Sequence, residues 1–134
     1  LIIGCGAVGA MEGALDRTIA YCKEREAFGG PLMQFQNTRF QLAEAKTKTM
    51  VARAFLDECI AEHLRGELTV DKAAMQKYWL TDTQGEVLDV CLQMHGGYGF
   101  MQEYAVGNMW ADARVQRIYG GTNEIMKELI ARSL

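Results

Sequence analysis

The chain has 134 residues, 49% of them hydrophobic, which is enough for one domain with a buried core and too few for two. Its 14 basic and 17 acidic residues give a formal net charge of -3, and no Lys/Arg run could neutralise a nucleic acid or an anionic membrane. No apolar stretch approaches the length of a membrane span. We therefore expect a single domain with no nucleic acid partner and no membrane span.

The segment Leu1–Gly9 contains the spacing G-x-G-x-x-G after three apolar residues. This spacing binds a dinucleotide when it joins a strand to a helix within repeated βαβ units. The sequence that follows offers helices only, which argues against a dinucleotide-binding fold. We interpret Gly4, Gly6, Gly9 and Gly13 as small residues on a helix, where each lowers helix propensity but lets a neighbouring helix approach closely.

Two long helices are predicted on either side of Pro31, because Phe28-Gly29-Gly30-Pro31 is a strong helix breaker. Apolar or small residues recur in both segments at intervals of three and four, the spacing of one helical face. In the first helix these residues are Val8, Met11, Leu15 and Ile19. In the second, which extends to Gly66, they are Leu42, Ala45, Thr49, Ala52, Leu56 and Cys59.

A third helix is predicted from about Thr69 to the glycine-rich turn at His95–Gly99. Its buried face is expected to comprise Ala74, Tyr78, Thr81, Gly85, Leu88 and Leu92. A fourth helix from about Glu103 to Ile118 and a short fifth from Thr122 to Ser133 complete the chain, and no alternating β pattern of useful length is present. The sequence therefore predicts an all-α fold, an up-and-down four-helix bundle with a short extra C-terminal helix.

The cysteines and histidines do not form a metal-binding pattern. Cys5, Cys22, Cys59 and Cys91 include no C-x-x-C pair and have no ligand-like spacing to His63 or His95. We therefore expect free thiols and no metal site.

Four segments at helix ends differ from ordinary bundle sequence. They are Arg25–Gly29 with Phe35–Gln36, Gln93–Phe100, Asp112–Arg114 and Ile118–Glu124. Each alone has a structural explanation, such as a glycine cap or Thr122 as an N-cap. In their order and intervals they resemble the C-terminal domain of the acyl-CoA dehydrogenase family, with R-x-x-F-G-x-x-L-x-x-x-Q, Q-x-x-G-G-x-G-[FY], [RD]-D-A-[RK] and I-Y-x-G-T-x-[EQ]. The resemblance covers essentially the whole chain and is closest to the long-chain and isovaleryl-type subgroup.

The resemblance implies a homo-oligomer, expected to be a tetramer, in which FAD lies across a subunit contact. The positions implied to contact FAD are Arg25, Ala27, Phe28, Phe35, Gln36, Gln93, Met94, His95, Gly96, Gly97, Thr122, Asn123 and Glu124. Within this set, the Arg25 guanidinium would suit the pyrophosphate, and the glycines would allow the backbone to approach the cofactor.

The reaction implied is α,β-dehydrogenation of an acyl-CoA thioester to a trans-2-enoyl-CoA, with electrons passed to an electron-transferring flavoprotein in the bacterial cytoplasm or the mitochondrial matrix. Substrate would meet Tyr119, Gly120 and Gly121, and the backbone N–H of Gly120 would polarise the thioester carbonyl. Many relatives carry the catalytic glutamate at the position of Gly120. Glycine has no side chain and supplies no base. In the long-chain and isovaleryl-type subgroup that glutamate corresponds to a position two residues before Leu1.

We therefore expect no catalytic base within the chain itself. Glu12, the nearest candidate on the first helix, would lie about 20 Å from the expected base along the helix axis. The first residue is Leu1 and no capping residue precedes the first helix. These observations indicate a fragment, and the resemblance implies that residues 1–134 are a C-terminal helical domain without its N-terminal helical and middle β-domains, inactive when isolated. Two alternatives remain: a non-catalytic flavin-binding or scaffold member of the family, or an acyl-CoA oxidase.

Overall fold

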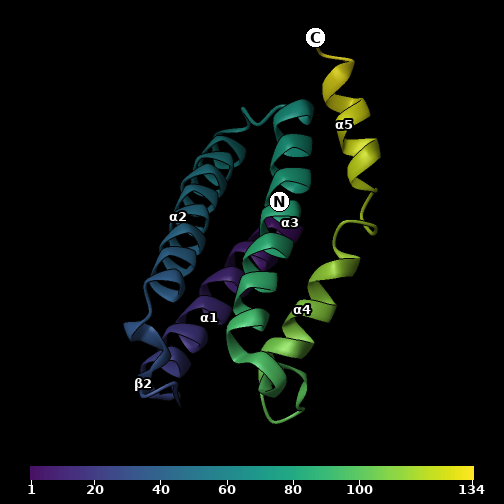
Figure 1. Cartoon of the computed structure of the whole chain (residues 1–134). Coiled ribbons are helices and arrows are strands. Elements are labelled where there is room, and N and C mark those ends of the chain that lie inside the picture. Colours follow the sequence, from purple (N-terminus) through teal and green to yellow (C-terminus); the bar gives the residue numbers. More distant parts are fainter.

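The computed structural model describes residues 1–134 and contains five α-helices (Figure 1). They are α1 (Ile2–Glu24), α2 (Gln36–Arg65), α3 (Val70–His95), α4 (Ala105–Val115) and α5 (Asn123–Ala131). The predicted all-α bundle with a short C-terminal helix is confirmed. The last two helices are shorter than predicted, because the segments around them form turns.

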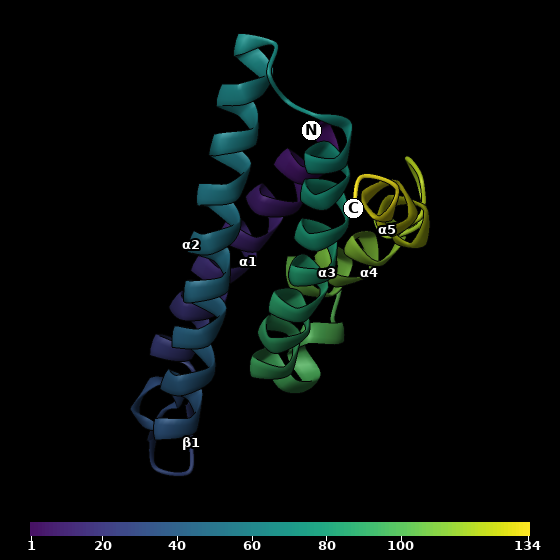
Figure 2. The same cartoon turned by 90° about the horizontal axis from the view of Figure 1, so that it is seen from above.

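Helix α3 is the centre of the bundle, because it packs against all the other helices. Helices α1 and α2 cover one side of it, and the shorter α4 and α5 follow one another along the other side (Figures 1 and 2). Side chains at the helix starts support this arrangement: Thr69 Oγ1 caps α3 and Thr122 Oγ1 caps α5. The arrangement leaves the turn between α4 and α5 beside the N-terminal half of α3.

A short hairpin at the end of α1 was not predicted. Strands β1 (Glu26–Ala27) and β2 (Gly30–Pro31) pair in antiparallel fashion and lead into the 3-10 helix η1 (Leu32–Gln34). Two-residue strands are too short to produce a recognisable alternation in sequence. A second 3-10 helix, η2 (Gly96–Phe100), occupies the glycine-rich turn after α3.

The buried faces follow the predicted stripes most closely in α2, where all six predicted residues are buried. In α1 the first three are fully buried and Ile19 is partly exposed. The prediction for α3 was less accurate, because Tyr78 and Gly85 are only half-buried. Polar residues of this helix that were not on the predicted face are buried as well, among them Gln76, Lys77, Thr83 and Gln84.

The interpretation of the α1 glycines is correct for Gly4 and wrong for Gly6 and Gly9. A Cβ at Gly4 would lie 1.3 Å from Gln76 Nε2, so only glycine fits there without rearrangement. Gly6 and Gly9 are exposed, and a Cβ on either would meet nothing within 4 Å. At Gly13 a Cβ would make an ordinary contact, 3.8 Å from Met109 Cε. The wrong predictions arise because successive helical residues point in different directions, and these two point to solvent.

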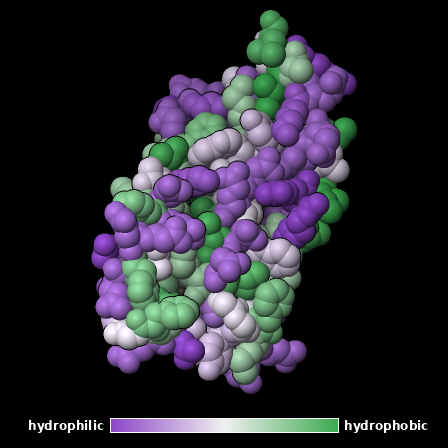
Figure 3. All heavy atoms as spheres, in the orientation of Figure 1, coloured by the Kyte–Doolittle hydropathy of each residue, from purple (hydrophilic) through white to green (hydrophobic).

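The surface carries apolar side chains in several separate groups among polar ones (Figure 3). Phe28, Phe100 and Leu64 are among the most exposed of these side chains. All four cysteines have free thiols, and three of them are buried. None of the helices has the length and hydropathy needed to cross a membrane.

Candidate functional site

The candidate residues fall into two groups at opposite ends of α1. The first group surrounds Arg25, near the C-terminal ends of α1 and α3. The second is the turn between α4 and α5, which contacts Ile3 near the N-terminal end of α1. With a rise of 1.5 Å per residue, Ile3 and Arg25 lie roughly 33 Å apart along the helix.

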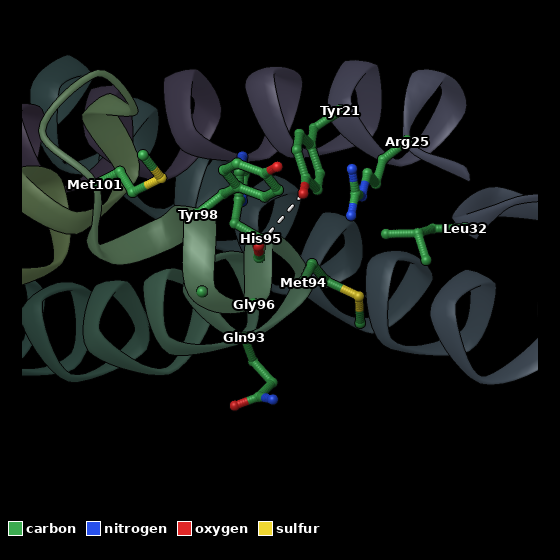
Figure 4. A pocket seen from close by; sticks show the side chains of 10 residues that line it. Tyr21, Arg25, Leu32, Gln93, Met94, His95, Gly96, Tyr98 and Met101 are labelled. Carbon is green, nitrogen blue, oxygen red and sulfur yellow. Dashed lines mark hydrogen bonds between the residues drawn. The ribbon is translucent and has the colours of Figure 1, made fainter. Parts of the chain in front are cut away.

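The first group forms a pocket of about 490 Å³, here called the Arg25 pocket (Figure 4). Its lining includes six of the predicted cofactor residues: Arg25, Gln93, Met94, His95, Gly96 and Gly97. The rest of the lining is Tyr21, Leu32, Tyr98 and Met101. The Gln93 side chain points away from Tyr21 and Arg25 (Figure 4). The pocket therefore combines one cation, several aromatic or apolar side chains and a glycine backbone.

An aromatic cluster fixes one wall of the Arg25 pocket. The Tyr21 ring stacks on His95 with centroids 4.3 Å apart, and its hydroxyl donates to the His95 carbonyl at 3.3 Å. The His95 ring is buried, with Nδ1 2.8 Å from the Cys91 carbonyl oxygen. Burial raises the pKa of Tyr21. His95 is thus an anchored structural residue, as the hydrogen bonding and stacking use its ring.

Arg25 lines the pocket and its charge is accessible. It is exposed, forms no salt bridge, and its Cζ lies 5.0 Å from the centroid of the Tyr98 ring. A cation held over an aromatic ring loses some freedom without losing its charge. Arg25 is therefore oriented and free to bind an anion.

The predicted residues of the hairpin lie beside the pocket and do not line it. Phe28 is 95% exposed and has φ of 53°, a left-handed conformation that is unusual for a bulky residue. Its ring packs edge-to-face on Phe35, with centroids 6.3 Å apart. Ala27 is half-buried and Gln36 is exposed at the first position of α2. Phe28 in the hairpin and Phe35 directly before α2 thus form an aromatic pair near the bundle surface.

The second group is the turn Tyr119–Thr122, here called the Gly120 turn. Gly120 and Gly121 have φ of 63° and 91°, left-handed values that favour glycine. A Cβ at Gly120 would lie 2.4 Å from Ile3 Cδ1. The turn is therefore shaped by glycine and sits against the first turn of α1.

The three residues after the turn begin α5 and differ in exposure. Thr122 Oγ1 accepts a hydrogen bond from Ile125 N at 3.3 Å. The Asn123 side chain is buried and bonded within the protein, to Lys77, Thr81 and Asp82. Glu124 is exposed, and a hydrogen bond from its own backbone N–H lowers its pKa. Of these three, Glu124 has the most accessible side chain.

A family model described as acyl-CoA dehydrogenase, C-terminal domain, matches residues 1–134. The chain belongs to the acyl-CoA dehydrogenase family. It is 46% identical over 134 residues to the mitochondrial long-chain specific acyl-CoA dehydrogenase of Mus musculus, covering 100% of this chain and 31% of that relative.

Two solved structures resemble this acyl-CoA dehydrogenase domain closely. The acyl-CoA dehydrogenase of Geobacillus kaustophilus matches with a TM-score of 0.96 and 39% identity, covering 98% of this chain and 35% of that one. A structure of PigA with FAD and proline matches with a TM-score of 0.90 and 28% identity, covering 98% and 35%. The chain thus spans about a third of the length of these relatives, 31% of the Mus musculus enzyme and 35% of the Geobacillus kaustophilus one.

Several residues that surround the candidate site residues of this acyl-CoA dehydrogenase domain were not predicted from the sequence. Tyr21 lies one helical turn before Arg25 on the same face, and this spacing could have indicated it. Lys77 contacts the Gly120 turn and lies on the buried stripe of α3, between Ala74 and Thr81. A lysine on an otherwise buried stripe is the sequence feature that could have indicated it. In the remaining motif, Asp112 and Arg114 are exposed and Ala113 is buried.

Proposed function

We propose that this domain belongs to a FAD-dependent enzyme that converts acyl-CoA thioesters to trans-2-enoyl-CoA and passes the electrons to an electron-transferring flavoprotein. The whole enzyme would work as a homotetramer in the bacterial cytoplasm or the mitochondrial matrix. The observation that carries the proposal is the contact between Gly120 and Ile3, because it brings the substrate turn to the start of α1. The name of the Mus musculus relative supports the substrate class and the mitochondrial alternative.

The Gly120 turn would bind the thioester through its backbone. Neither Gly120 nor Gly121 takes part in a backbone–backbone hydrogen bond, so the N–H of Gly120 can donate to a substrate carbonyl oxygen. Such a donor stabilises the negative charge that develops on this oxygen when the α-proton leaves. The turn would therefore make the α-proton more acidic without supplying a base.

The base would come from the N-terminal extension of α1. Ile3 lies four residues after the expected glutamate, and residues four apart share one face of a helix. If the helix continues before Leu1, that glutamate lies on the face that meets Gly120. Glu12 has another role, because both its carboxylate oxygens accept hydrogen bonds from Arg53, at 2.9 and 2.6 Å.

The residues of the Arg25 pocket fit a flavin nucleotide. The exposed Arg25 guanidinium offers a planar set of donors for a phosphate. A Cβ at Gly96 or Gly97 would meet nothing within 4 Å, so both glycines leave open space beside the pocket. When bound, FAD would accept the hydride from the β-carbon of the substrate. The PigA structure with FAD, a relative of this fold, supports the choice of cofactor.

The separation of the two groups favours an oligomeric site. Because they lie roughly 33 Å apart along α1, the Arg25 pocket and the Gly120 turn of one chain would serve different FAD molecules. One cofactor would then meet the turn of its own subunit and the pocket of a neighbour. This arrangement makes the oligomer necessary for a complete site.

Anaerobic stopped-flow reduction of the flavin in the full-length enzyme tests the proposal. An acyl-CoA should bleach the flavin and yield enoyl-CoA, and replacing the glutamate two positions before Leu1 by glutamine should abolish the bleaching. Full bleaching in this variant would reject the assigned base. A wild-type enzyme that binds FAD and is not reduced by any acyl-CoA would instead support a non-catalytic member, and rapid peroxide formation in air would indicate an oxidase.

A further inference from the structure

A charged residue, Lys77, is buried in the core between α3 and the start of α5. Its relative exposure is 5%, and it forms no salt bridge with a carboxylate. Burial lowers its pKa, while the negative charges of Asp82 and Glu124 oppose that shift. Burying an ammonium group is unfavourable unless hydrogen bonds compensate, so its partners explain why it is there.

Both partners of Lys77 belong to the Gly120 turn or the residue after it. Its Nζ donates to the Gly121 carbonyl oxygen at 2.8 Å and to Asn123 Oδ1 at 2.7 Å. The Asn123 amide in turn donates to Thr81 Oγ1 and Asp82 Oδ1, both at 3.0 Å. A buried polar network therefore ties the turn to the rigid helix α3.

The Gly120 turn has few hydrogen bonds of its own that could fix its conformation. Glycine populates left- and right-handed conformations about equally, so two adjacent glycines do not specify one shape. The backbone hydrogen bond from Asn123 N to the Arg117 carbonyl, at 3.0 Å, closes the loop only at its outer ends. The backbone groups of Gly120 and Gly121 take part in one hydrogen bond, the one from Lys77 Nζ to the Gly121 carbonyl oxygen.

We propose that Lys77, assisted by Asn123, is a positioning residue that fixes the Gly120 turn so that the Gly120 N–H points at the thioester carbonyl. This inference rests on the proposed function, in which that N–H binds the substrate. Lys77 would act through Gly121 without touching substrate. Losing it would weaken the interaction with the carbonyl oxygen most, because the Gly120 N–H is the donor that this oxygen would meet.

The test uses the flavin-loaded full-length enzyme with Lys77→Met, which keeps the length of the side chain and removes its donors. Two ligands are compared: an acyl-CoA thioester, and the corresponding alkyl-CoA thioether, which lacks the carbonyl oxygen. Lys77→Met should slow flavin reduction at saturating thioester about tenfold or more, short of the roughly hundredfold loss typical of deleting an oxyanion donor. Thioether affinity should change by less than about twofold. Lys46→Met replaces an exposed lysine on α2 and is the matched control. It should leave the rate of flavin reduction and the thioether affinity unchanged.

Asn123→Ser gives an independent test if Lys77→Met does not fold, because it removes the amide partner of Lys77 and leaves the Thr122 cap of α5 in place. Asn123→Ser should also slow flavin reduction by the thioester and leave the thioether affinity unchanged, with a smaller effect on the rate. An equal loss with both ligands, or no loss with either, in the folded variants would overturn the positioning role. An inactive wild-type enzyme would reject the proposed function, and the role of Lys77 with it, whereas an active wild type with unaltered variants rejects the role alone.

Discussion

Gly120 and Ile3 are in direct contact although they come from opposite ends of the chain, and a Cβ at position 120 would lie 2.4 Å from Ile3 Cδ1. The contact leaves no room for a side chain at position 120, and the backbone there has a left-handed φ of 63°. Gly120 thus has two separate reasons to be glycine, and each can be measured.

Gly120→Ala should destabilise the protein more than Gly66→Ala. Both glycines have a left-handed φ, of 63° and 74°, which costs an L-residue about 1 to 2 kcal/mol. A Cβ at Gly66 would meet nothing within 4 Å, so only Gly120→Ala also displaces a neighbour. Urea unfolding of the two variants measures the difference. Equal losses would show that Ile3 moves aside freely.

The glycines of α1 should respond in opposite directions to alanine. Gly9 is exposed in open space within the helix, so Gly9→Ala should raise the free energy of unfolding by about 0.5 to 1 kcal/mol. Gly4→Ala should lower it by about 1 to 3 kcal/mol, because the new Cβ would overlap the buried Gln76 amide. Thermal unfolding of both variants checks the signs. A stabilised Gly4→Ala variant would contradict the packing described.

Much of the fold could be predicted from the sequence because hydrophobic periodicity reports burial directly. The stripe from Leu42 to Cys59 in α2 is buried as predicted. The same logic misplaced the buried face of α3 by choosing Tyr78 over Lys77, because a lysine is normally taken as solvent-exposed. Its burial follows from partners beyond residue 120. The periodicity of a single helix carries no information on hydrogen bonds to residues so distant in the sequence.

The motifs of the candidate site could be predicted from the sequence, but their arrangement in space could not. Neither spacing nor composition indicates that Arg25 and Gly120 lie near opposite ends of α1, because this depends on how α4 and α5 pack along α3. The aromatic wall of Tyr21 and His95 was likewise missed, since these residues meet only when the ends of α1 and α3 come together. The roles of the predicted residues toward FAD remain predictions.

The Glu12–Arg53 pair should make stability fall at acid pH. Hydrogen bonding to Arg53 lowers the pKa of Glu12 from its ordinary value of 4.5. A carboxyl with a lowered folded-state pKa stabilises the protein above its unfolded pKa, and this contribution is lost as pH falls through the folded value. The pair is partly exposed, so the effect should be about 0.2 to 1 kcal/mol and should shrink in high salt.

Unfolding of the wild type and Glu12→Gln between pH 7 and pH 2 measures this contribution as a difference. The two stability curves should be separated near neutral pH and converge in acid, as the pH falls through the lowered pKa of Glu12 and the carboxylate becomes protonated. Glu44→Gln on α2 is the control, because Glu44 is exposed and forms no ion pair. A constant separation across this range would show that the carboxylate charge is not what stabilises the pair.

Gly97→Ala should separate cofactor binding from stability. A Cβ at Gly97 would meet nothing within 4 Å, and its φ is not left-handed, so the free energy of unfolding should change by less than about 0.5 kcal/mol. If FAD lies against this backbone, the added methyl group occupies its space, and the Kd for FAD should rise about tenfold. Titrating the full-length apoenzyme with FAD and following quenching of flavin fluorescence measures the Kd. Gly9→Ala, far from the Arg25 pocket, should leave it unchanged, and an unaltered Kd in Gly97→Ala would remove Gly97 from the cofactor site.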